Sequence, residues 1–276
     1  MIEAGATLGQ ARLSLPLDPL ENRILLCHAL RLPRVALITQ SERILTAAEA
    51  ASLNALAQRR LDGEPIAYIV GEREFFGLPF KVSPAVLIPR PDTELIVELA
   101  LERLAPGLPQ PQRVLDMGTG SGAIAVAIAH TRPELDVSAL DVSADALEIA
   151  RANAAANGAR VRFLRSDWYA AIGAERFDMI VSNPPYIVAG DRHLGEGDLR
   201  FEPIDALTDH ADGLSDLRTI IDGAQAHLED GAWLLLEHGF DQAGAVRALL
   251  QERGYHEVQS WRDLSGIERV SGGRRA

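Results

Sequence analysis

The chain has 276 residues, of which 47% are hydrophobic and 24% are charged, so it has the composition of a globular protein and room for two domains. A formal net charge of −12 argues against broad capture of DNA or RNA phosphates, and no apolar run approaches the roughly 18 residues of a membrane span. The one cysteine, Cys27, cannot form an internal disulfide, and the N-terminus lacks a secretory pattern, so we expect a cytoplasmic protein.

The first part of the chain has the periodicity of helices. Apolar residues recur every three to four positions between Ala4 and Asp62, and Thr46 offers an N-cap within this segment. Aromatic residues among glycines and a proline then favour a β-hairpin between Ile66 and Val82. The predicted domains are a helical domain over residues 1–65, a β-hairpin linker over residues 66–86 and an α/β domain over residues 87–276.

Strand and helix patterns alternate in the second half of the chain. A helix that begins at Asp92 or Thr93 and ends near Leu104 is expected to precede them. The predicted strands are 114–117, 136–140, 162–165, 177–182 and 232–237, and the predicted helices are 123–130, 144–157, 214–227 and 242–253. A polar insertion is expected up to residue 212, and a closing hairpin near 255–261 and 268–272. The alternation predicts a parallel sheet covered by helices.

A glycine-rich turn, Asp116-Met117-Gly118-Thr119-Gly120-Ser121-Gly122, follows the first predicted strand of this domain. On its own it is weak evidence, because a plain strand-to-helix turn also uses glycine. Dinucleotide-binding proteins space their glycines as GxGxxG to place a pyrophosphate at a helix N-terminus, whereas the spacing here is GxGxG. Asp116 would repel a pyrophosphate but could engage the cationic amino-acid end of S-adenosylmethionine, directly or through water, so we predict this methyl donor as the cofactor.

Two further strand ends carry candidate cofactor contacts. Asp141 ends the second strand, where its carboxylate can accept hydrogen bonds from both ribose hydroxyls of a nucleoside cofactor. Trp168 follows the third strand; in isolation it would be a core residue, but its place at the sheet edge favours packing on adenine. Asp167, beside it, can accept a hydrogen bond from the exocyclic amine of adenine.

The sequence Asn183-Pro184-Pro185-Tyr186 follows the fourth predicted strand, at the same sheet edge. An amide or aromatic amine nitrogen is a poor nucleophile because its lone pair is delocalised, and two acceptors can hold its hydrogens. The predicted acceptors are the side-chain oxygen of Asn183 and the carbonyl oxygen of Pro184, while Tyr186 packs on the flat group. The motif indicates methyl transfer to a planar nitrogen through orientation of that nitrogen, with a merely rigid turn as the alternative.

Other candidate residues are weaker. Glu237-His238-Gly239 lies near the same edge, but no further ligands follow at the spacing of a metal site, so no metal is expected. His193 and His210 belong to the polar insertion and are expected at the surface. No serine or cysteine has the setting of a nucleophile, which methyl transfer does not require.

Several motifs taken together resemble a known family. They are Leu87-Ile88-Pro89-Arg90-Pro91-Asp92-Thr93-Glu94, the Gly118–Gly122 loop, Asp167-Trp168, Asn183-Pro184-Pro185-Tyr186 and Arg200-Phe201-Glu202-Pro203. Over nearly its whole length the chain is similar to the bacterial PrmC/HemK family of peptide chain release factor glutamine (N5) methyltransferases. The tail after Arg269 departs from the family pattern, which concerns the last strand and not the site.

The resemblance implies a Rossmann-like, seven-stranded class I methyltransferase domain with a small N-terminal helical domain joined by a β-hairpin. It implies methylation of the side-chain amide N5 of the glutamine in the Gly-Gly-Gln motif of class 1 release factors, in support of translation termination. The implied cofactor contacts are Gly118, Thr119, Gly120, Ser121, Gly122, Asp141, Trp168 and Asn183. The implied glutamine contacts are Asn183, Pro184, Pro185 and Tyr186, with Asn183 and Pro184 as the catalytic pair.

Two other functions stay open from the sequence. An amino-methyltransferase acting on adenine in DNA or RNA would use the same Asn-Pro-Pro-Tyr motif, which does not distinguish an amide from a base. The mixed or acidic character of the helical segment and of residues 187–212 favours a protein acceptor, so no direct DNA binding is expected. A non-catalytic protein that binds the cofactor is the second alternative, and the intact Asn183 argues against it. We expect a monomer without membrane association.

Overall fold

The computed structural model describes residues 1–105 and 110–276. Contacts between residues divide the chain into two compact units, Met1–Gly71 and Glu72–Ala276. Each unit has hydrophobic clusters of its own, so the two are described separately. Among the residues described, no helix is both long enough and apolar enough to cross a membrane.

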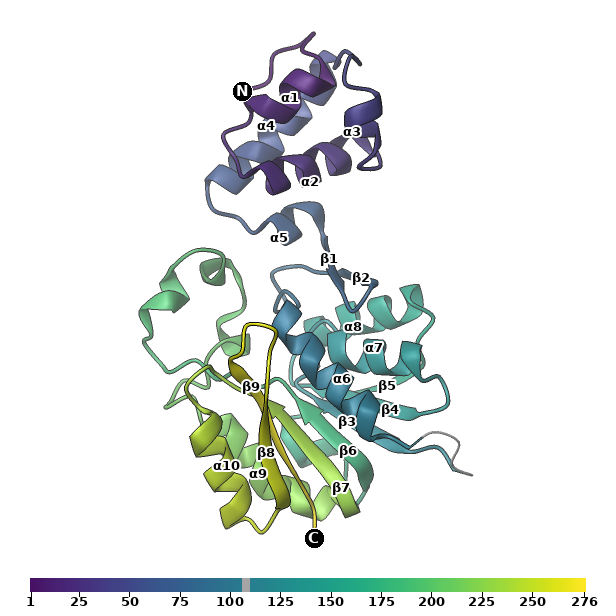
Figure 1. The fold of residues 1–276 in the computed structure, drawn as a ribbon, viewed down its shortest axis with the longest axis vertical. Helices are drawn as coiled ribbons and strands as arrows, with labels where there is room; N and C mark the ends of the chain where they lie inside the picture. The colour runs from purple at the N-terminus through teal and green to yellow at the C-terminus, as the bar shows by residue number, and fades with distance from the viewer. Residues whose placement is uncertain (106–109) are drawn as a thin grey trace. The chain divides into compact units, whose positions relative to one another are not determined.

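The first unit consists of helices around a core rich in leucine (Figure 1). The helices are α1 (Leu8–Ser14), α2 (Pro19–Leu30), α3 (Ala36–Thr39), α4 (Ala47–Leu61) and α5 (Ile66–Val70). Thr46 caps α4 as the sequence predicted: its hydroxyl accepts from the N–H of Glu49, and the Glu49 carboxylate accepts from the N–H of Thr46. Leu25, Leu26 and Leu53 are fully buried between the helices, which accounts for the helical periodicity of this segment.

The hairpin is shorter than the sequence pattern indicated. Residues Ile66–Val70, expected to begin it, form helix α5, which ends where Gly71 adopts the left-handed conformation with φ of 77°. Strands β1 (Glu72–Phe75) and β2 (Leu78–Lys81) then pair in antiparallel fashion. Tyr68 and Ile69 are buried in this helix, and they would also be buried in a strand. A short apolar run therefore does not distinguish a helix from a strand.

The second unit is built on a seven-stranded sheet with the order β5-β4-β3-β6-β7-β9-β8. Its strands are β3 (Arg113–Met117), β4 (Asp136–Asp141), β5 (Val161–Arg165), β6 (Phe177–Ser182), β7 (Leu228–Glu237), β8 (His256–Arg262) and β9 (Glu268–Arg274). The first five run parallel, and β9 is antiparallel to both β7 and β8. The chain leaves β3 toward β4 and β5 and returns to β6 on the other side of β3. The carboxyl ends of β3 and β6 therefore form a topological switch point, where open α/β sheets bind ligands.

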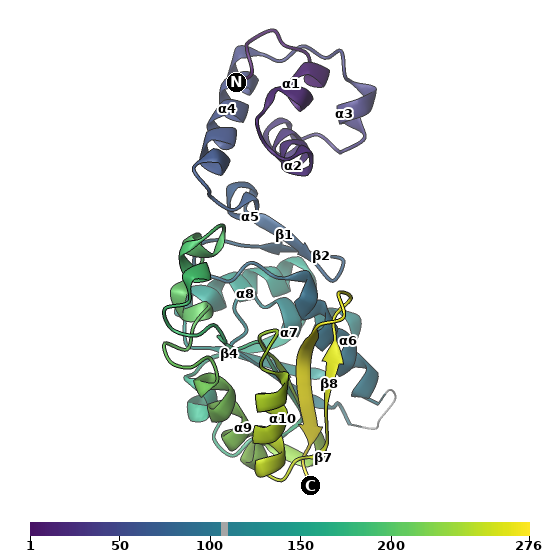
Figure 2. The same ribbon diagram turned by 60° about the vertical axis from the view of Figure 1, so that its left-hand side comes forward.

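Helices cover both faces of this sheet (Figure 2). The helical segments of this unit are η1 (Pro91–Thr93), α6 (Glu94–Arg103), α7 (Ala123–Thr131), α8 (Ala144–Ala156), η2 (Trp168–Ala171), η3 (Arg192–Gly195), η4 (Leu199–Phe201), η5 (Ile204–Ala206), α9 (Ser215–His227) and α10 (Ala243–Glu252). Of these, α6, α7 and α8 pack on one face of the sheet and α9 and α10 on the other. Val114 packs with α6 and α7, whereas its neighbour Leu115 packs with α9 and α10 on the opposite face. Successive side chains of a strand point to opposite faces, so both faces need apolar residues.

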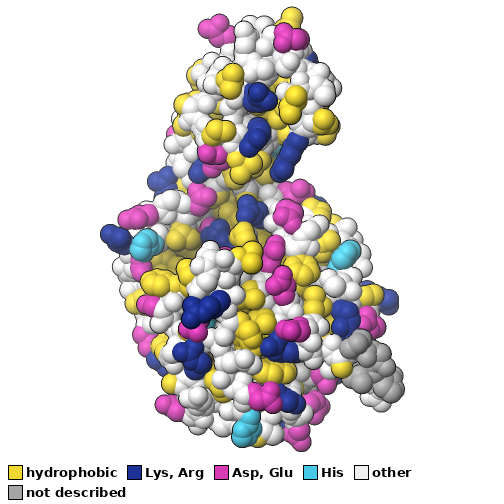
Figure 3. All heavy atoms as spheres, in the orientation of Figure 1, with side chains coloured by type: hydrophobic (Ala, Val, Ile, Leu, Met, Phe, Trp, Pro, Cys, Tyr) yellow, Lys and Arg dark blue, Asp and Glu magenta, His cyan; other side chains and the backbone are white. Residues whose placement is uncertain are grey.

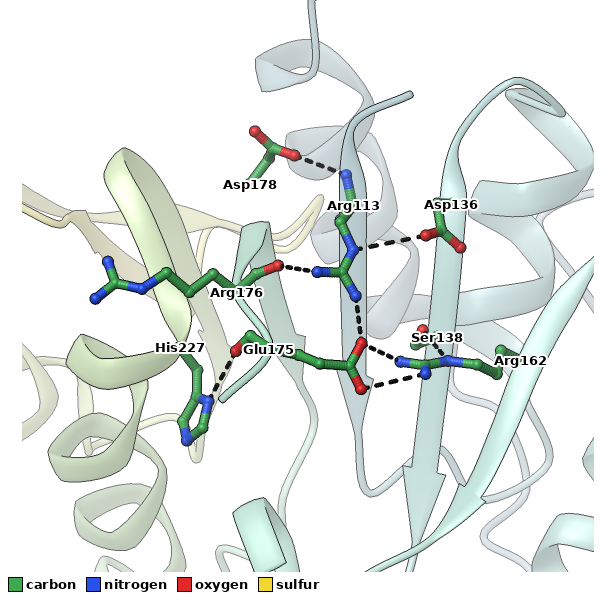
Figure 4. Close-up of polar contacts among 8 residues, drawn as sticks. All are labelled: Arg113, Asp136, Ser138, Arg162, Glu175, Arg176, Asp178 and His227. Atoms are coloured by element: carbon green, nitrogen blue, oxygen red, sulfur yellow. Dashed lines mark hydrogen bonds and ion pairs between the residues drawn. The ribbon is translucent and has the colours of Figure 1, made fainter. Parts of the chain in front are cut away.

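A polar network ties the amino ends of the parallel strands together (Figure 4). The guanidinium of Arg113, at the start of β3, pairs with Glu175 and donates to the carbonyl of Arg176 at 2.8 Å. Arg162 of β5 donates to Glu175 at 2.8 Å and to Ser138 of β4 at 3.0 Å. These charged groups hold the strands in order at the edge of the sheet opposite the switch point.

The last strand is formed in spite of the unusual tail. Residues Glu268–Arg274 pair with both β7 and β8, two residues beyond the predicted end at Gly272. A Cβ at Gly272 would lie 2.4 Å from the carbonyl oxygen of Leu234, and one at Gly273 would lie 3.0 Å from the Cβ of Tyr255. Glycine at these positions lets β9 lie close to its neighbours, so this tail still forms the last strand of the sheet.

Candidate active site

A cavity of about 380 Å³ opens at the carboxyl ends of β3, β4 and β6. This volume lies within the range of small-molecule sites, and its place is the switch point of the sheet. The residues that line it come from residues 85–93 before α6, the glycine loop with the start of α7, the ends of β4 and β5, the start of α8, the segment after β6, the polar insertion and α9. Among the predicted site residues, the cavity is lined by Gly118, Thr119, Gly120, Ser121, Asp141, Trp168, Asn183 and Pro185.

Three predicted site residues, Gly122, Pro184 and Tyr186, are not among the residues that line the cavity. Gly122 adopts φ of 84°, and a Cβ there would lie 3.1 Å from the Cβ of Ala150, so it serves the close packing of α7 and α8. Pro184 is buried. Tyr186 is half-buried, and its hydroxyl donates to the Oε1 of Glu237 over a long 3.4 Å. The structure thus brings most of the predicted set together and leaves these three side chains outside the lining.

The glycine loop wraps around the end of β4. Gly118 and Gly120 have positive φ values of 70° and 55°, which a residue with a side chain adopts only at a cost. The N–H groups of Gly118 and Thr119 both donate to the carbonyl of Leu140 at 2.9 Å. The N–H of Gly120 donates to the Oδ2 of Asp141 at 2.8 Å. These bonds bring loop backbone and carboxylate to the same wall of the cavity.

Asp141 is largely enclosed but still lines the cavity. Its Oδ1 accepts from the N–H of Ser143 at 2.9 Å, and its Oδ2 accepts from Gly120, so the carboxylate is held by one bond on each oxygen. Burial raises the pKa of Asp141, and the backbone bonds to Ser143 and Gly120 oppose that rise. Each oxygen keeps a second lone pair, so Asp141 has capacity to accept from a diol.

Asp116 takes a different position from the one expected. It is fully buried and does not line the cavity, so it is not placed to meet a cationic ligand directly. Its Oδ2 accepts from the hydroxyl of Thr119 at 2.6 Å and from the N–H of Ala125 at 3.2 Å. Burial raises the pKa of Asp116 to about 7. Within the described chain its Oδ1 has no hydrogen-bond partner, and the residue acts on the site by holding the glycine loop from behind.

Trp168 belongs to both the core and the cavity wall. Its ring packs against the hydrophobic cluster that includes α9. A Cβ at Gly118 would lie 3.8 Å from the ring, which is an ordinary van der Waals distance. Its backbone has φ of 42°, and its carbonyl accepts from the hydroxyl of Ser166 at 2.6 Å. A polar contact joins Trp168 to Asp216 of α9, another residue of the lining. Glycine at 118 keeps the space beside the indole free of a side chain.

Asn183 is anchored to the segment that precedes α6. Its Nδ2 donates to the Oγ1 of Thr93 at 3.2 Å, and both residues line the cavity. The carbonyl of Tyr186 accepts from the Nε2 of Gln242 at 3.0 Å, which fixes the other end of the Asn-Pro-Pro-Tyr motif. The motif is therefore held at both ends by side chains from elsewhere in the chain.

Sequence reasoning left two buried acidic residues without a role. Glu202, in the polar insertion, accepts from the N–H of Ile88 at 3.0 Å and pairs with the guanidinium of Arg90, and so holds the insertion against the cavity. Glu237 is buried at the end of β7, and burial raises its pKa to about 7 against the opposing effects of Thr93 and Arg269. The motifs around Arg90 and Glu202 were noted in the resemblance, but only the fold pairs them.

Two family models match the chain: the PrmC N-terminal domain over residues 2–71 and the methyltransferase small domain over residues 94–195. A release factor glutamine methyltransferase of Burkholderia pseudomallei (strain K96243) is 54% identical over 276 residues, which cover 98% of this chain and 96% of the relative. The chain belongs to the release factor glutamine methyltransferase family. A second member, from Bordetella pertussis, is 54% identical over 93% of this chain and 95% of its own length.

Solved structures agree with this family assignment at the level of the fold. A 16S rRNA N2 G1207 methyltransferase of T. Thermophilus, in complex with AdoMet and guanosine, matches with a TM-score of 0.56 at 23% identity over 74% of this chain and 50% of that one. A methyltransferase from Pyrococcus furiosus matches with a TM-score of 0.54 at 22% identity over 79% of this chain and 97% of that one. The predicted seven-stranded methyltransferase fold and the predicted family are both confirmed.

Proposed function

We propose that this enzyme transfers a methyl group from S-adenosyl-L-methionine to the side-chain amide N5 of the glutamine in the Gly-Gly-Gln motif of class 1 peptide chain release factors. The observation that carries the proposal is the position of Asn183, which lines the cavity with its Nδ2 bound to Thr93. Relatives named release factor glutamine methyltransferase, 54% identical over nearly the full chain, support the choice of acceptor.

The cavity has the groups that this cofactor needs. The loop Gly118–Ser121 exposes backbone without side-chain bulk, Asp141 offers acceptor capacity for the ribose hydroxyls, and Trp168 offers a flat apolar face for adenine. When bound, S-adenosylmethionine supplies a methyl group on a positively charged sulfur, which keeps the electrons of the broken S–C bond. These residues would therefore hold the nucleoside part of the cofactor and leave the methyl group near Asn183.

The residues of the Asn-Pro-Pro-Tyr motif then act on the glutamine amide. The Oδ1 of Asn183 and the carbonyl oxygen of Pro184 would each accept one hydrogen of the NH₂ group, which turns the nitrogen toward the methyl group. The two acceptors also stabilise the positive charge that develops on this nitrogen, until the nitrogen releases one proton to water and becomes the neutral N-methyl amide. The rigid backbone of Pro184 and Pro185 keeps both oxygens in place without reorganisation during the reaction.

Charge distribution favours a protein acceptor over a nucleic acid. The net charge is −12, and Figure 3 shows basic and acidic side chains interspersed over the face in view, without a continuous basic stripe. An enzyme that binds a nucleic-acid duplex gains much of its affinity from such a stripe. This charge distribution supports the proposal that the enzyme does not bind DNA directly. We also propose that it acts on release factors as a monomer in the cytoplasm.

A labelling experiment tests the proposed acceptor. Purified enzyme with methyl-labelled S-adenosylmethionine is expected to label a class 1 release factor, and to lose that label when the glutamine of Gly-Gly-Gln is replaced by alanine. The controls are naked DNA and ribosomal RNA at equal mass, which should stay unlabelled because the charge opposes their capture. Labelling of either nucleic acid above the release factor would refute the assignment.

We further propose that the first unit docks the release factor, because a flexible tripeptide offers little binding surface by itself. Val35 and Ile38 at α3 are large apolar side chains that remain 61% and 69% exposed, beside Arg31 and Arg34. A short peptide with the Gly-Gly-Gln motif is expected to show a KM about a hundredfold above that of the whole factor, at similar kcat. Equal KM values for peptide and whole factor would remove the docking role.

A further inference from the structure

The side chain of Asn153, in helix α8, is completely buried although it does not line the cavity. Its Nδ2 donates to the carbonyl of Ser121 at 2.8 Å and to the carbonyl of Lys81 at 3.0 Å. Its Oδ1 accepts from the N–H of Lys81 at 2.7 Å. Both amide hydrogens and the amide oxygen are therefore in use, and the side chain bridges two separate segments of backbone.

The backbone groups around Asn153 fix which way its amide lies. The N–H of Lys81 can only donate, and the carbonyls of Lys81 and Ser121 can only accept. A flipped amide would set its oxygen against the two carbonyls and its NH₂ group against the N–H, so every one of these contacts would be repulsive. The orientation of Asn153 thus follows from main-chain groups alone and depends on no hydroxyl or titratable side chain.

The two segments that Asn153 joins lie on different sides of the cavity wall. Ser121 belongs to the glycine loop and lines the cavity. Lys81 ends strand β2 of the hairpin, and none of the described residues that line the cavity belongs to β1 or β2. The bonds of Asn153 therefore connect the loop that faces the cofactor with a hairpin that does not reach it.

The hairpin is fastened to the second unit by contacts of its own. Phe75 and Phe80 are buried in the hydrophobic cluster that includes α7, with ring centroids 5.9 Å apart in an edge-to-face arrangement. The N–H of Phe76, in the turn of the hairpin, donates to the Oε1 of Glu94 at 2.8 Å. Because these contacts do not involve the glycine loop, the hairpin gives Asn153 a fixed support from which to hold the loop.

We propose that Asn153 is a positioning residue for the methyl donor: it holds the carbonyl of Ser121, and with it the glycine loop, in the conformation that receives S-adenosylmethionine. The same bonds couple the order of the loop to that of the hairpin, so cofactor binding at the loop also stabilises β1 and β2. The inference rests on the part of the proposed function that places the cofactor against the glycine loop. Asn153 acts through Ser121 and does not itself line the cavity.

The first test is the affinity of Asn153→Ala for the cofactor. The substitution leaves the buried carbonyl of Ser121 without this donor, and the Kd for S-adenosylmethionine, measured by calorimetry, is expected to rise by about tenfold. The kcat for the release factor at saturating cofactor should stay within about threefold of the wild-type value, because the Asn-Pro-Pro-Tyr motif keeps its bonds to Thr93 and Gln242.

Asn157, which follows α8, is the matched control. Its Nδ2 donates to the carbonyl of Pro79 in the same hairpin at 2.9 Å, and its side-chain bonds among the described residues do not reach the glycine loop. Asn157→Ala therefore loosens the hairpin without releasing Ser121, and its Kd for the cofactor should stay within about twofold of the wild-type value. Equal losses of affinity in the two variants, or wild-type affinity in Asn153→Ala, would overturn the positioning role.

Hydrogen–deuterium exchange of the wild-type protein tests the coupling without any substitution. Saturating S-adenosylmethionine is expected to slow the exchange of backbone amides in residues 72–81 by about threefold or more, although these residues do not line the cavity. In Asn153→Ala this protection of the hairpin should be lost, while the glycine loop is still protected. Unchanged exchange of the wild-type hairpin refutes the coupling even if Asn153→Ala does not fold.

Asp141→Ala distinguishes this inference from the function on which it rests. If the wild type binds no S-adenosylmethionine, or if Asp141→Ala binds it as tightly as the wild type, the placement of the cofactor fails and the inference fails with it. If Asp141→Ala loses affinity and Asn153→Ala does not, the role of Asn153 fails alone. Loss of affinity in both variants with wild-type affinity in Asn157→Ala supports the positioning role.

Discussion

Replacement of Asn183 by alanine is expected to lower kcat by about a thousandfold, the upper range seen when one preorganised hydrogen-bond partner is removed from a reacting group. The variant loses the Oδ1 acceptor and also the bond from Nδ2 to Thr93 that anchors the motif. Its Kd for S-adenosylmethionine is expected to rise by less than about tenfold, because the glycine loop, Asp141 and Trp168 remain in place around the cavity. Single-turnover transfer to the release factor measures the first quantity, and calorimetry with cofactor alone measures the second.

A comparison of the change in kcat with the change in the Kd for S-adenosylmethionine decides between two roles of Asn183. A thousandfold loss of turnover with cofactor still bound assigns the residue to the acceptor amide. An equal loss of cofactor affinity would instead assign it to cofactor binding, and turnover near the wild-type rate would refute the mechanism. A non-catalytic cofactor-binding protein, the second alternative from the sequence, predicts no turnover even for the wild type.

The sequence predicted most of the second unit because its signals are local. The strand Phe177–Ser182 has the bounds predicted for it, since a continuous apolar run between polar segments leaves little choice. The glycine loop and Asp141 were placed at one edge by strand alternation alone, and the cavity is found there. What periodicity identifies well is a long element with one buried face.

Short helices and strands, and contacts between residues far apart in the sequence, could not be predicted from periodicity. Helix α5 has five residues, and so short an apolar run fits a helix or a strand equally. The ion pair of Arg90 with Glu202 joins positions 112 residues apart, and Thr93 with Asn183 lie 90 apart, so no spacing rule connects them. Asp116 was expected to engage the cofactor directly or through water, and its burial behind the glycine loop could not be read from the sequence.

The second large effect concerns Asp141. Asp141→Ala is expected to weaken S-adenosylmethionine binding by about a hundredfold, since it removes the charged acceptor at the cavity and frees the N–H of Gly120 and of Ser143. The loop loses the bond that draws it against β4, so part of the loss reflects a less ordered binding wall. Calorimetry or equilibrium dialysis with cofactor measures the change, and kcat at saturating cofactor is expected to fall by less than about tenfold.

A nearby carboxylate serves as the matched control. Asp145 lies in the first turn of α8, is exposed and does not line the cavity, yet it carries the same charge four positions away. Asp145→Ala therefore removes one negative charge near the cavity and leaves the hydrogen bonds of Asp141 intact. The Kd of this variant for S-adenosylmethionine should stay within about twofold of the wild-type value, because exposed charges are screened. If both variants lose affinity equally, attraction by net charge and not the contact of Asp141 controls binding. If neither loses affinity, the cofactor does not lie against the end of β4.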